Sequence, residues 1–158
     1  EVLYKGVKAF RDTSGYNLLY SKTAIGSGGV FGKGYKQGSV TQGKFVPEQE
    51  TDYIFCTVGE EWGFLGSSLL VIFYAVYIGR IYYLAENQKT TFNRVFGYCF
   101  AGVLLMHFAI NLGMVMGLFP TVGIPLPYFS YGGSSFLAFS IMTAIFFKLN
   151  YTDKNSLV

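Results

Sequence analysis

Charged residues are scarce in this sequence: they make up 13% of its 158 residues, whereas soluble domains carry about 25%. Only one histidine and two cysteines, Cys56 and Cys99, are present, and neither cysteine has a second ligand nearby at zinc spacing. Neither a zinc site nor a disulfide framework is therefore expected. The net charge of +3 is small and scattered, so we expect no nucleic-acid partner. A start methionine and a signal-peptide pattern are also missing, and we interpret the chain as a piece of a longer protein.

Long apolar runs are what the sequence has instead. They cover about residues 64–84, 95–119 and 130–149, and the first two are interrupted by a single charge, Arg80. A helix needs about 20 residues to cross about 30 Å of hydrocarbon. A soluble helical core hardly accommodates three such segments in so short a stretch. The sequence therefore predicts an all-α, polytopic membrane bundle with three transmembrane helices.

The charges of the connecting loops predict the orientation of these helices. Lys89 and Arg94 lie in the 85–94 loop, Lys148 stands at the end of the third apolar run and Lys154 follows it, whereas the 120–133 loop has no charge. Short loops rich in Lys and Arg stay in the cytoplasm. We therefore expect the 85–94 loop and the C-terminus to be cytoplasmic, and residues 1–62 and 120–133 to be extracytoplasmic.

A glycine-rich segment, AIGSGGVFGKGYKQGS, occupies residues 24–39. Its spacing fits neither a P-loop nor a dinucleotide fingerprint. One interpretation is a flexible surface loop. The other is a loop whose backbone amides, together with Lys33 and Lys36, approach a phosphate such as that of a lipid headgroup.

Three acids, Glu48, Glu50 and Asp52, lie within KFVPEQETDYIF (44–55), shortly before the first apolar run. Thr51 is a good N-cap, which would place Asp52 in the first turn of a helix, where a carboxylate is stabilised. The alternative is functional, because Asp52 heads a helical face of small residues that favours close helix packing: Cys56, Gly59, Gly63 and Gly66. An acid held beside packed membrane helices is a candidate functional residue.

Other polar residues near the apolar runs have two interpretations each. One interpretation is that Glu61 anchors the helix at the membrane interface. The other is that its carboxylate accepts a hydrogen bond, either from Thr57 or from a cation. His107 and Asn111 lie four residues apart on one helical face, where they either bond neighbouring helices or relay protons.

The 120–133 loop contains residues that restrict its backbone. Pro125 and Pro127 forbid a helix there, Gly132 and Gly133 predict a turn, and Ser134-Ser135 are expected to cap the third helix. A stiff, uncharged and aromatic loop of this kind indicates one wall of a cavity.

Together these segments resemble the SEDS family of bacterial cell-wall proteins, which includes RodA, FtsW and SpoVE, and RodA most closely. The resemblance is carried by residues 21–66, by NLGMVMGLFPTVGIPLPYFSYGGSS (111–135) and by TTFNR (90–94). Members have ten transmembrane helices, so the resemblance implies that this chain holds the last three and the large extracytoplasmic loop before them. It also implies the bacterial cytoplasmic (inner) membrane as the location.

The resemblance implies a peptidoglycan glycosyltransferase that polymerises lipid II during cell-wall elongation and cell-shape maintenance. The family's essential acid lies in the motif TD[FY]IF, which selects Asp52 as general base or catalytic carboxylate. By the same resemblance we assign substrate binding to Lys22, Lys33, Gln37, Glu61, Tyr131 and Ser134. The structural glycines and prolines are Gly26, Gly28, Gly29, Pro125, Pro127, Gly132 and Gly133.

The implied partners are lipid II, membrane lipid and a class B penicillin-binding protein, the transpeptidase that cross-links the strands. No cofactor is certain, and a divalent cation, Mg or Mn, is an option for the departing pyrophosphate. Two other functions remain open at this point. One is a flippase for a lipid-linked precursor, and the other is a scaffold without catalysis in the wall-synthesis complex.

Overall fold

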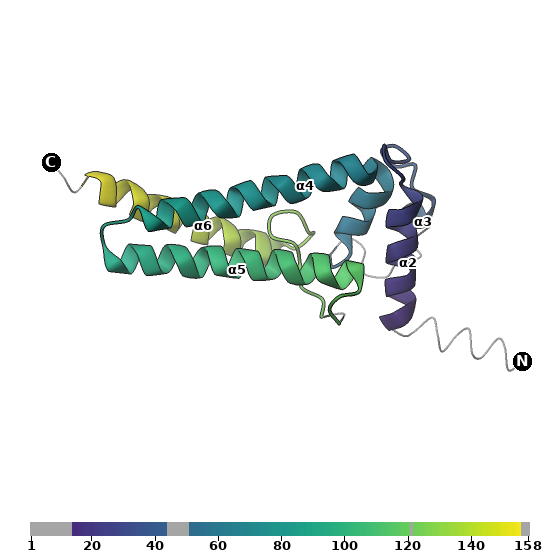
Figure 1. Cartoon of the computed structure of the whole chain (residues 1–158). Helices are drawn as coiled ribbons and strands as arrows, with labels where there is room; N and C mark the ends of the chain where they lie inside the picture. The colour runs from purple at the N-terminus through teal and green to yellow at the C-terminus, as the bar shows by residue number, and fades with distance from the viewer. Residues whose placement is uncertain (1–13, 44–50, 121, 156–158) are drawn as a thin grey trace, which may run out of the picture.

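The computed structural model describes residues 14–43, 51–120 and 122–155 and shows a bundle of helices. The elements are α2 (Ser14–Ser27), α3 (Ser39–Gln42), α4 (Ile54–Glu86), α5 (Thr91–Met116) and α6 (Gly133–Asn155). Helices α4, α5 and α6 run alongside one another, and α2 lies across the end of the bundle where α4 begins and α5 ends (Figure 1). We call this end the α2 end.

Three of these helices are long and apolar enough to cross a membrane: Ile54–Glu86, Thr91–Met116 and Gly133–Asp153. The predicted all-α architecture with three candidate spans is therefore confirmed. Large apolar side chains such as Leu69, Phe73 and Leu105 are exposed along them, which suits helices that face lipid or further helices.

The helix ends differ from the predicted ones for local reasons. Helix α4 begins at Ile54, well before residue 64, but Gly63 interrupts it with φ 65° and ψ −160°. The predicted start of the first span therefore falls directly after this break. Helix α5 stops at Met116 rather than 119, because Gly117 adopts a left-handed conformation and the amide of Leu118 donates to the carbonyl of Gly113 (2.7 Å).

Helix α6 continues past the predicted end at residue 149. The carboxylate of Asp153 accepts hydrogen bonds from the amide of Lys89 (2.7 Å) and from the amide and hydroxyl of Thr90 (3.3 and 2.8 Å). Thr90 is the N-cap of α5 and has no side-chain capping bond of its own. Asp153 therefore caps α5 from another helix, which favours the extra turn of α6.

Helix α2 lies where the sequence pattern gave no helix. Its residue Ala24 is fully buried, and the hydroxyl of Ser21 donates to the carbonyl of Val115 near the end of α5 (3.3 Å). Packing against α4 and α5, rather than an amphipathic pattern of its own, stabilises this helix.

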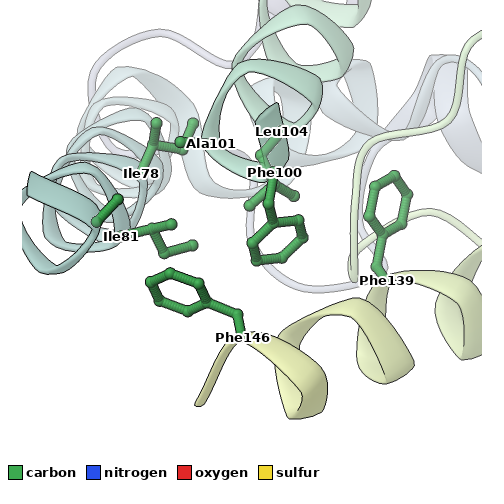
Figure 2. Close-up of a cluster of buried hydrophobic side chains, with 8 residues drawn as sticks. Ile78, Ile81, Phe100, Ala101, Leu104, Phe139 and Phe146 are labelled. Carbon is green, nitrogen blue, oxygen red and sulfur yellow. The ribbon is translucent and has the colours of Figure 1, made fainter. Parts of the chain in front are cut away.

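The core between the three long helices is aromatic and aliphatic. Figure 2 shows Ile78 and Ile81 from α4 facing Phe100, Ala101 and Leu104 from α5, with Phe139 and Phe146 of α6 closing the cluster. Gly97 lets the helices approach here, because a Cβ on it would lie 2.5 Å from the Cβ of Ala85 and 2.9 Å from the ring of Phe146.

Gly97→Ala is expected to lower the unfolding temperature of the full-length protein in detergent, because overpacking of this kind costs about 1–3 kcal/mol. Gly102→Ala is the matched control on the same helix, since its Cβ would meet nothing within 4 Å. It should leave stability equal or higher, as alanine favours a helix by about 1 kcal/mol over glycine. Equal losses in the two variants would contradict the packing argument.

Candidate functional site

The break in α4 at Gly63 organises the α2 end. In a continuous helix the amides of Phe64 and Leu65 would bond the carbonyls of Glu60 and Glu61. Here both pairs are separated, and the glycine-rich segment bonds all four groups. Its amides at Lys33 and Gly34 donate to Glu60 and Glu61 (3.0 Å each), and its carbonyls at Gly29 and Val30 accept from Phe64 and Leu65 (2.9 and 3.2 Å). The predicted flexible loop is thus docked onto a broken helix.

This docking requires glycine at particular positions. A Cβ on Gly28 would lie 2.0 Å from the carbonyl oxygen of Gly59, and one on Gly32, whose φ is +80°, would lie 2.2 Å from that of Glu61. Gly29 has φ +59°, whereas a Cβ on Gly26 would meet nothing within 4 Å. Of the three glycines of this segment that were assigned to structure from sequence, Gly28 and Gly29 have a steric or conformational reason.

A fully buried carboxylate, Glu60, holds the rest of this segment in place. It forms an ion pair with Lys33 (2.7 Å) and accepts from the amides of Thr41 (2.8 Å) and Val40 (3.0 Å), while two hydroxyls lie at 3.4 Å, those of Ser27 and Ser39. Charge-assisted bonds of this kind offset the cost of burying the ion.

Sequence reasoning selected Glu61 and missed Glu60. The two acids are adjacent, and the only available signal was that neighbouring helical positions face different sides. Lys33, assigned to substrate binding, remains 29% exposed while bonded to Glu60 and to the hydroxyl of Ser39 (3.0 Å). Its contact with substrate stays a prediction.

Asp52 lies in a turn directly before α4, so the prediction that Thr51 caps the helix and Asp52 enters its first turn is wrong. Tyr53 is the N-cap. Burial raises the pKa of the Tyr53 hydroxyl, and the charges of Cys56 and Asp52 raise it further, so this phenol stays neutral. The predicted continuous face below Asp52 is also wrong, because the break at Gly63 divides it.

The segment that carries Asp52 is held by Asn111 of α5. This side chain is fully buried, and its Nδ2 donates to the main-chain carbonyls of Asp52 (2.9 Å) and Ile124 (2.7 Å). The Asp52 carboxylate lies against the 120–133 loop, since a Cβ on Gly123 would be 3.0 Å from its Oδ2. Asn111 was expected to bond neighbouring helices, and it bonds two irregular segments instead.

The 120–133 loop is fastened to all three long helices. The hydroxyl of Tyr74 donates to the carbonyl of Pro127, and Nδ1 of His107 lies 3.4 Å from the carbonyl of Pro125. Tyr128 adopts φ 62°, unusual for a non-glycine residue, while its hydroxyl donates to the carbonyl of Phe139 (3.0 Å) and bonds the hydroxyl of Thr143. The loop is therefore held in place by bonds to α4, α5 and α6.

The end of this loop differs in one detail from the sequence prediction. Helix α6 begins at Gly133 itself, so Gly133 is its first helical residue rather than part of a turn, and the predicted caps lie inside the first turn. Ser135 donates to the carbonyl of Gly132 (2.9 Å), and Ser134 is exposed.

The remaining predicted binding residues are spread over the α2 end. Lys22 is exposed, with its ammonium 2.9 Å from the Cβ position of Gly117, where the negative end of the α5 dipole favours a cation. Gln37 is exposed and lies against Gly34. Glu61 lines an apolar cavity of about 310 Å³ and Tyr131 a hollow of about 510 Å³, and the two share Ile54 and Phe129.

Glu48 and Glu50 lie outside the residues that the structure describes. Within residues 14–43, 51–120 and 122–155, no group of three or more His, Cys, Asp or Glu side chains is placed to hold a metal ion.

Comparison with known proteins identifies the family. The profile of the FtsW/RodA/SpoVE family, described as cell cycle protein, matches residues 5–155. The chain belongs to this family. It is 43% identical over 124 residues to the peptidoglycan glycosyltransferase MrdB of Escherichia coli K12, covering 78% of this chain and 34% of that protein.

Other members agree. The peptidoglycan glycosyltransferase RodA of Treponema pallidum is 36% identical over 137 residues, covering 87% of this chain and 32% of that protein. A solved chain from a peptidoglycan synthase complex, studied for its coordination of polymerization and crosslinking, superposes with a TM-score of 0.74 at 28% identity. That match covers 89% of this chain and 38% of the solved chain. The chain thus spans about a third of the length of the curated relatives it matches.

Gly32→Ala in the full-length protein is expected to undock the glycine-rich segment, because the new Cβ would clash with the Glu61 carbonyl in a backbone conformation that disfavours side chains by about 1–2 kcal/mol. Limited proteolysis with trypsin at Lys33 and Lys36 measures the undocking. Gly26→Ala is the control and should be cleaved as slowly as the wild type. Unchanged cleavage of Gly32→Ala would show that the docking does not require glycine at position 32.

Glu60→Gln should loosen residues 39–41, because the neutral amide loses the ion pair with Lys33 and has one acceptor oxygen for two backbone amides that now bond separate oxygens. Bonds to charged groups contribute about 1.5–3 kcal/mol, and we expect the lower end since Lys33 reaches solvent. Hydrogen–deuterium exchange at Val40 and Thr41 should quicken by about tenfold. Glu86→Gln, a change at an exposed acid, is the control, and equal exchange in both variants would refute the anchoring role.

Proposed function

We propose that this chain is part of a peptidoglycan glycosyltransferase of the bacterial inner membrane, which polymerises lipid II into glycan strands during cell-wall elongation. The relatives named above support the activity. The observation that carries the proposal is the placement of Asp52: its carboxylate lies between the start of α4 and the 120–133 loop, and a buried amide holds both segments.

We place the α2 end outside the cytoplasm. Asp52, the glycine-rich segment and the 120–133 loop gather there. Lys89, in the connection between α4 and α5, and Arg94, in the first turn of α5, lie at the other end of the bundle. Cations in a short loop favour the cytoplasmic side. An active site at the outer surface suits a lipid-linked sugar whose headgroup has already crossed the membrane.

The proposed reaction joins two lipid-linked sugars. The carboxylate of Asp52 takes the proton from an acceptor sugar hydroxyl, whose oxygen forms a bond to the anomeric carbon of the donor. The bond from that carbon to the pyrophosphate oxygen breaks, and the lipid pyrophosphate leaves with the electron pair. A single displacement of this kind inverts the configuration of the donor carbon.

The departing pyrophosphate carries negative charge that cations must stabilise. Lys22, exposed at the end of α5, and Lys33, partly exposed beside Glu60, are the proposed cations. Gln37, Glu61, Tyr131 and Ser134 are proposed to bind the sugar and peptide parts of the substrate.

The proposed partner is a class B penicillin-binding protein that cross-links the new strands. The similarity to a chain of a synthase complex that combines polymerization with crosslinking supports such an assembly.

Asp52→Asn in the full-length protein, assayed with lipid II and the transpeptidase partner, should reduce strand formation by about 10²- to 10⁴-fold, because the amide takes up no proton. Glu48→Gln and Glu50→Gln should be much milder. Near-normal polymerisation by Asp52→Asn would exclude Asp52 as the base, whereas a wild-type protein that forms no strands in this assay would leave a flippase or a scaffold as the function. Gel analysis of the glycan products makes the measurement.

A further inference from the structure

We infer that Asn111 is a positioning residue for the proposed glycosyl transfer, fixing the Asp52 carboxylate relative to the 120–133 loop. This inference rests on the proposed function of Asp52. Asn111 belongs to α5, outside both the segment of Asp52 and the 120–133 loop. Its side-chain nitrogen lies between these two segments, 2.9 Å from the Asp52 carbonyl and 2.7 Å from the Ile124 carbonyl.

The chemistry of the side chain determines its orientation. A carboxamide nitrogen has two hydrogens, and here each one has an acceptor, both of them main-chain carbonyl oxygens. The reversed amide would set its own oxygen against these two oxygens, so only the nitrogen fits this position. Asn111 is fully buried, and water therefore gives no easy replacement for either bond.

These two bonds determine the width of the site at the carboxylate. One fixes the main chain of Asp52, which lies in a turn and has no helix to hold it. The other fixes Ile124, the neighbour of Gly123, whose Cβ position lies 3.0 Å from Oδ2 of Asp52. Loss of the amide would release both sides at once. Misplacement of a reacting group by about 1 Å can cost about a hundredfold in rate.

Asn111→Asp tests this, because aspartic acid has nearly the same shape but at most one hydrogen, when protonated, for the two carbonyls. In the full-length protein with its partner, kcat for lipid II polymerisation should fall by about tenfold or more, while KM changes by less than about threefold, since substrate binding uses other residues. Asn111→Gln, which keeps the donor on a longer side chain, should recover part of kcat. If Asn111→Asp fails to fold, Asn111→Gln is compared with Asn111→Leu, which has no donor and should show the lower kcat. Equal kcat values for these two variants would overturn the inference.

Two controls separate positioning from other effects. Gln88→Glu makes the same amide-to-carboxylate change at a buried residue of the other end, where Nε2 bonds Asn150 (2.9 Å), and should keep wild-type kcat. His107→Leu removes the contact with Pro125 of the same loop but leaves Asp52 untouched. Its kcat loss should be much smaller than that of Asn111→Asp, and an equal loss would assign the effect to the loop alone.

Asp52→Asn in the same assay distinguishes the two possible failures. If Asp52→Asn polymerises normally, the proposed role of Asp52 as base fails whatever Asn111 does. If Asp52→Asn is inactive and Asn111→Asp keeps wild-type kcat, or loses only KM, the proposed base stands and the positioning role of Asn111 is wrong.

Discussion

The break of α4 at Gly63 is the feature on which the rest of the α2 end depends. A helix that breaks beside a membrane exposes backbone groups that lipid does not bond, and the glycine-rich segment bonds four of them. The docked segment in turn brings Lys33 and the start of α3 to Glu60. Close docking of this backbone, more than apolar packing, therefore explains why so many glycines are gathered in residues 28–34.

Asp52 belongs to a second arrangement at the same end, built on the 120–133 loop. Tyrosine hydroxyls fasten this loop to α4 and α6, and Asn111 fastens it to α5. Both irregular segments of the site are thus held by long helices through buried hydrogen bonds, which gives a carboxylate in a turn a defined position. The family relationship explains what such a carboxylate is proposed to do, and the bonds explain why it stays in place.

The three spans were predictable because a membrane helix needs only length and apolar composition. The break at Gly63 was not predictable, because a helix tolerates glycine and the conformation of Gly63 depends on contacts with residues far away in sequence. For the same reason sequence reasoning selected Glu61 rather than Glu60. It also predicted that Asp52 lies in the first turn of a helix, whereas the helix begins only at Ile54. Asp52 itself was found through its motif. Helix α2 escaped prediction because its stability comes from packing on α4 and α5.

Helix α6 is held at two places. In its first half and near its middle, Tyr128 bonds the Phe139 carbonyl and Thr143, and near its C-terminus Asp153 caps α5. A helix tied in this way cannot slide along its axis without breaking charged or buried bonds. It therefore gives the start of α5 and the loop beside Asp52 a shared support, because each is bonded to the same helix.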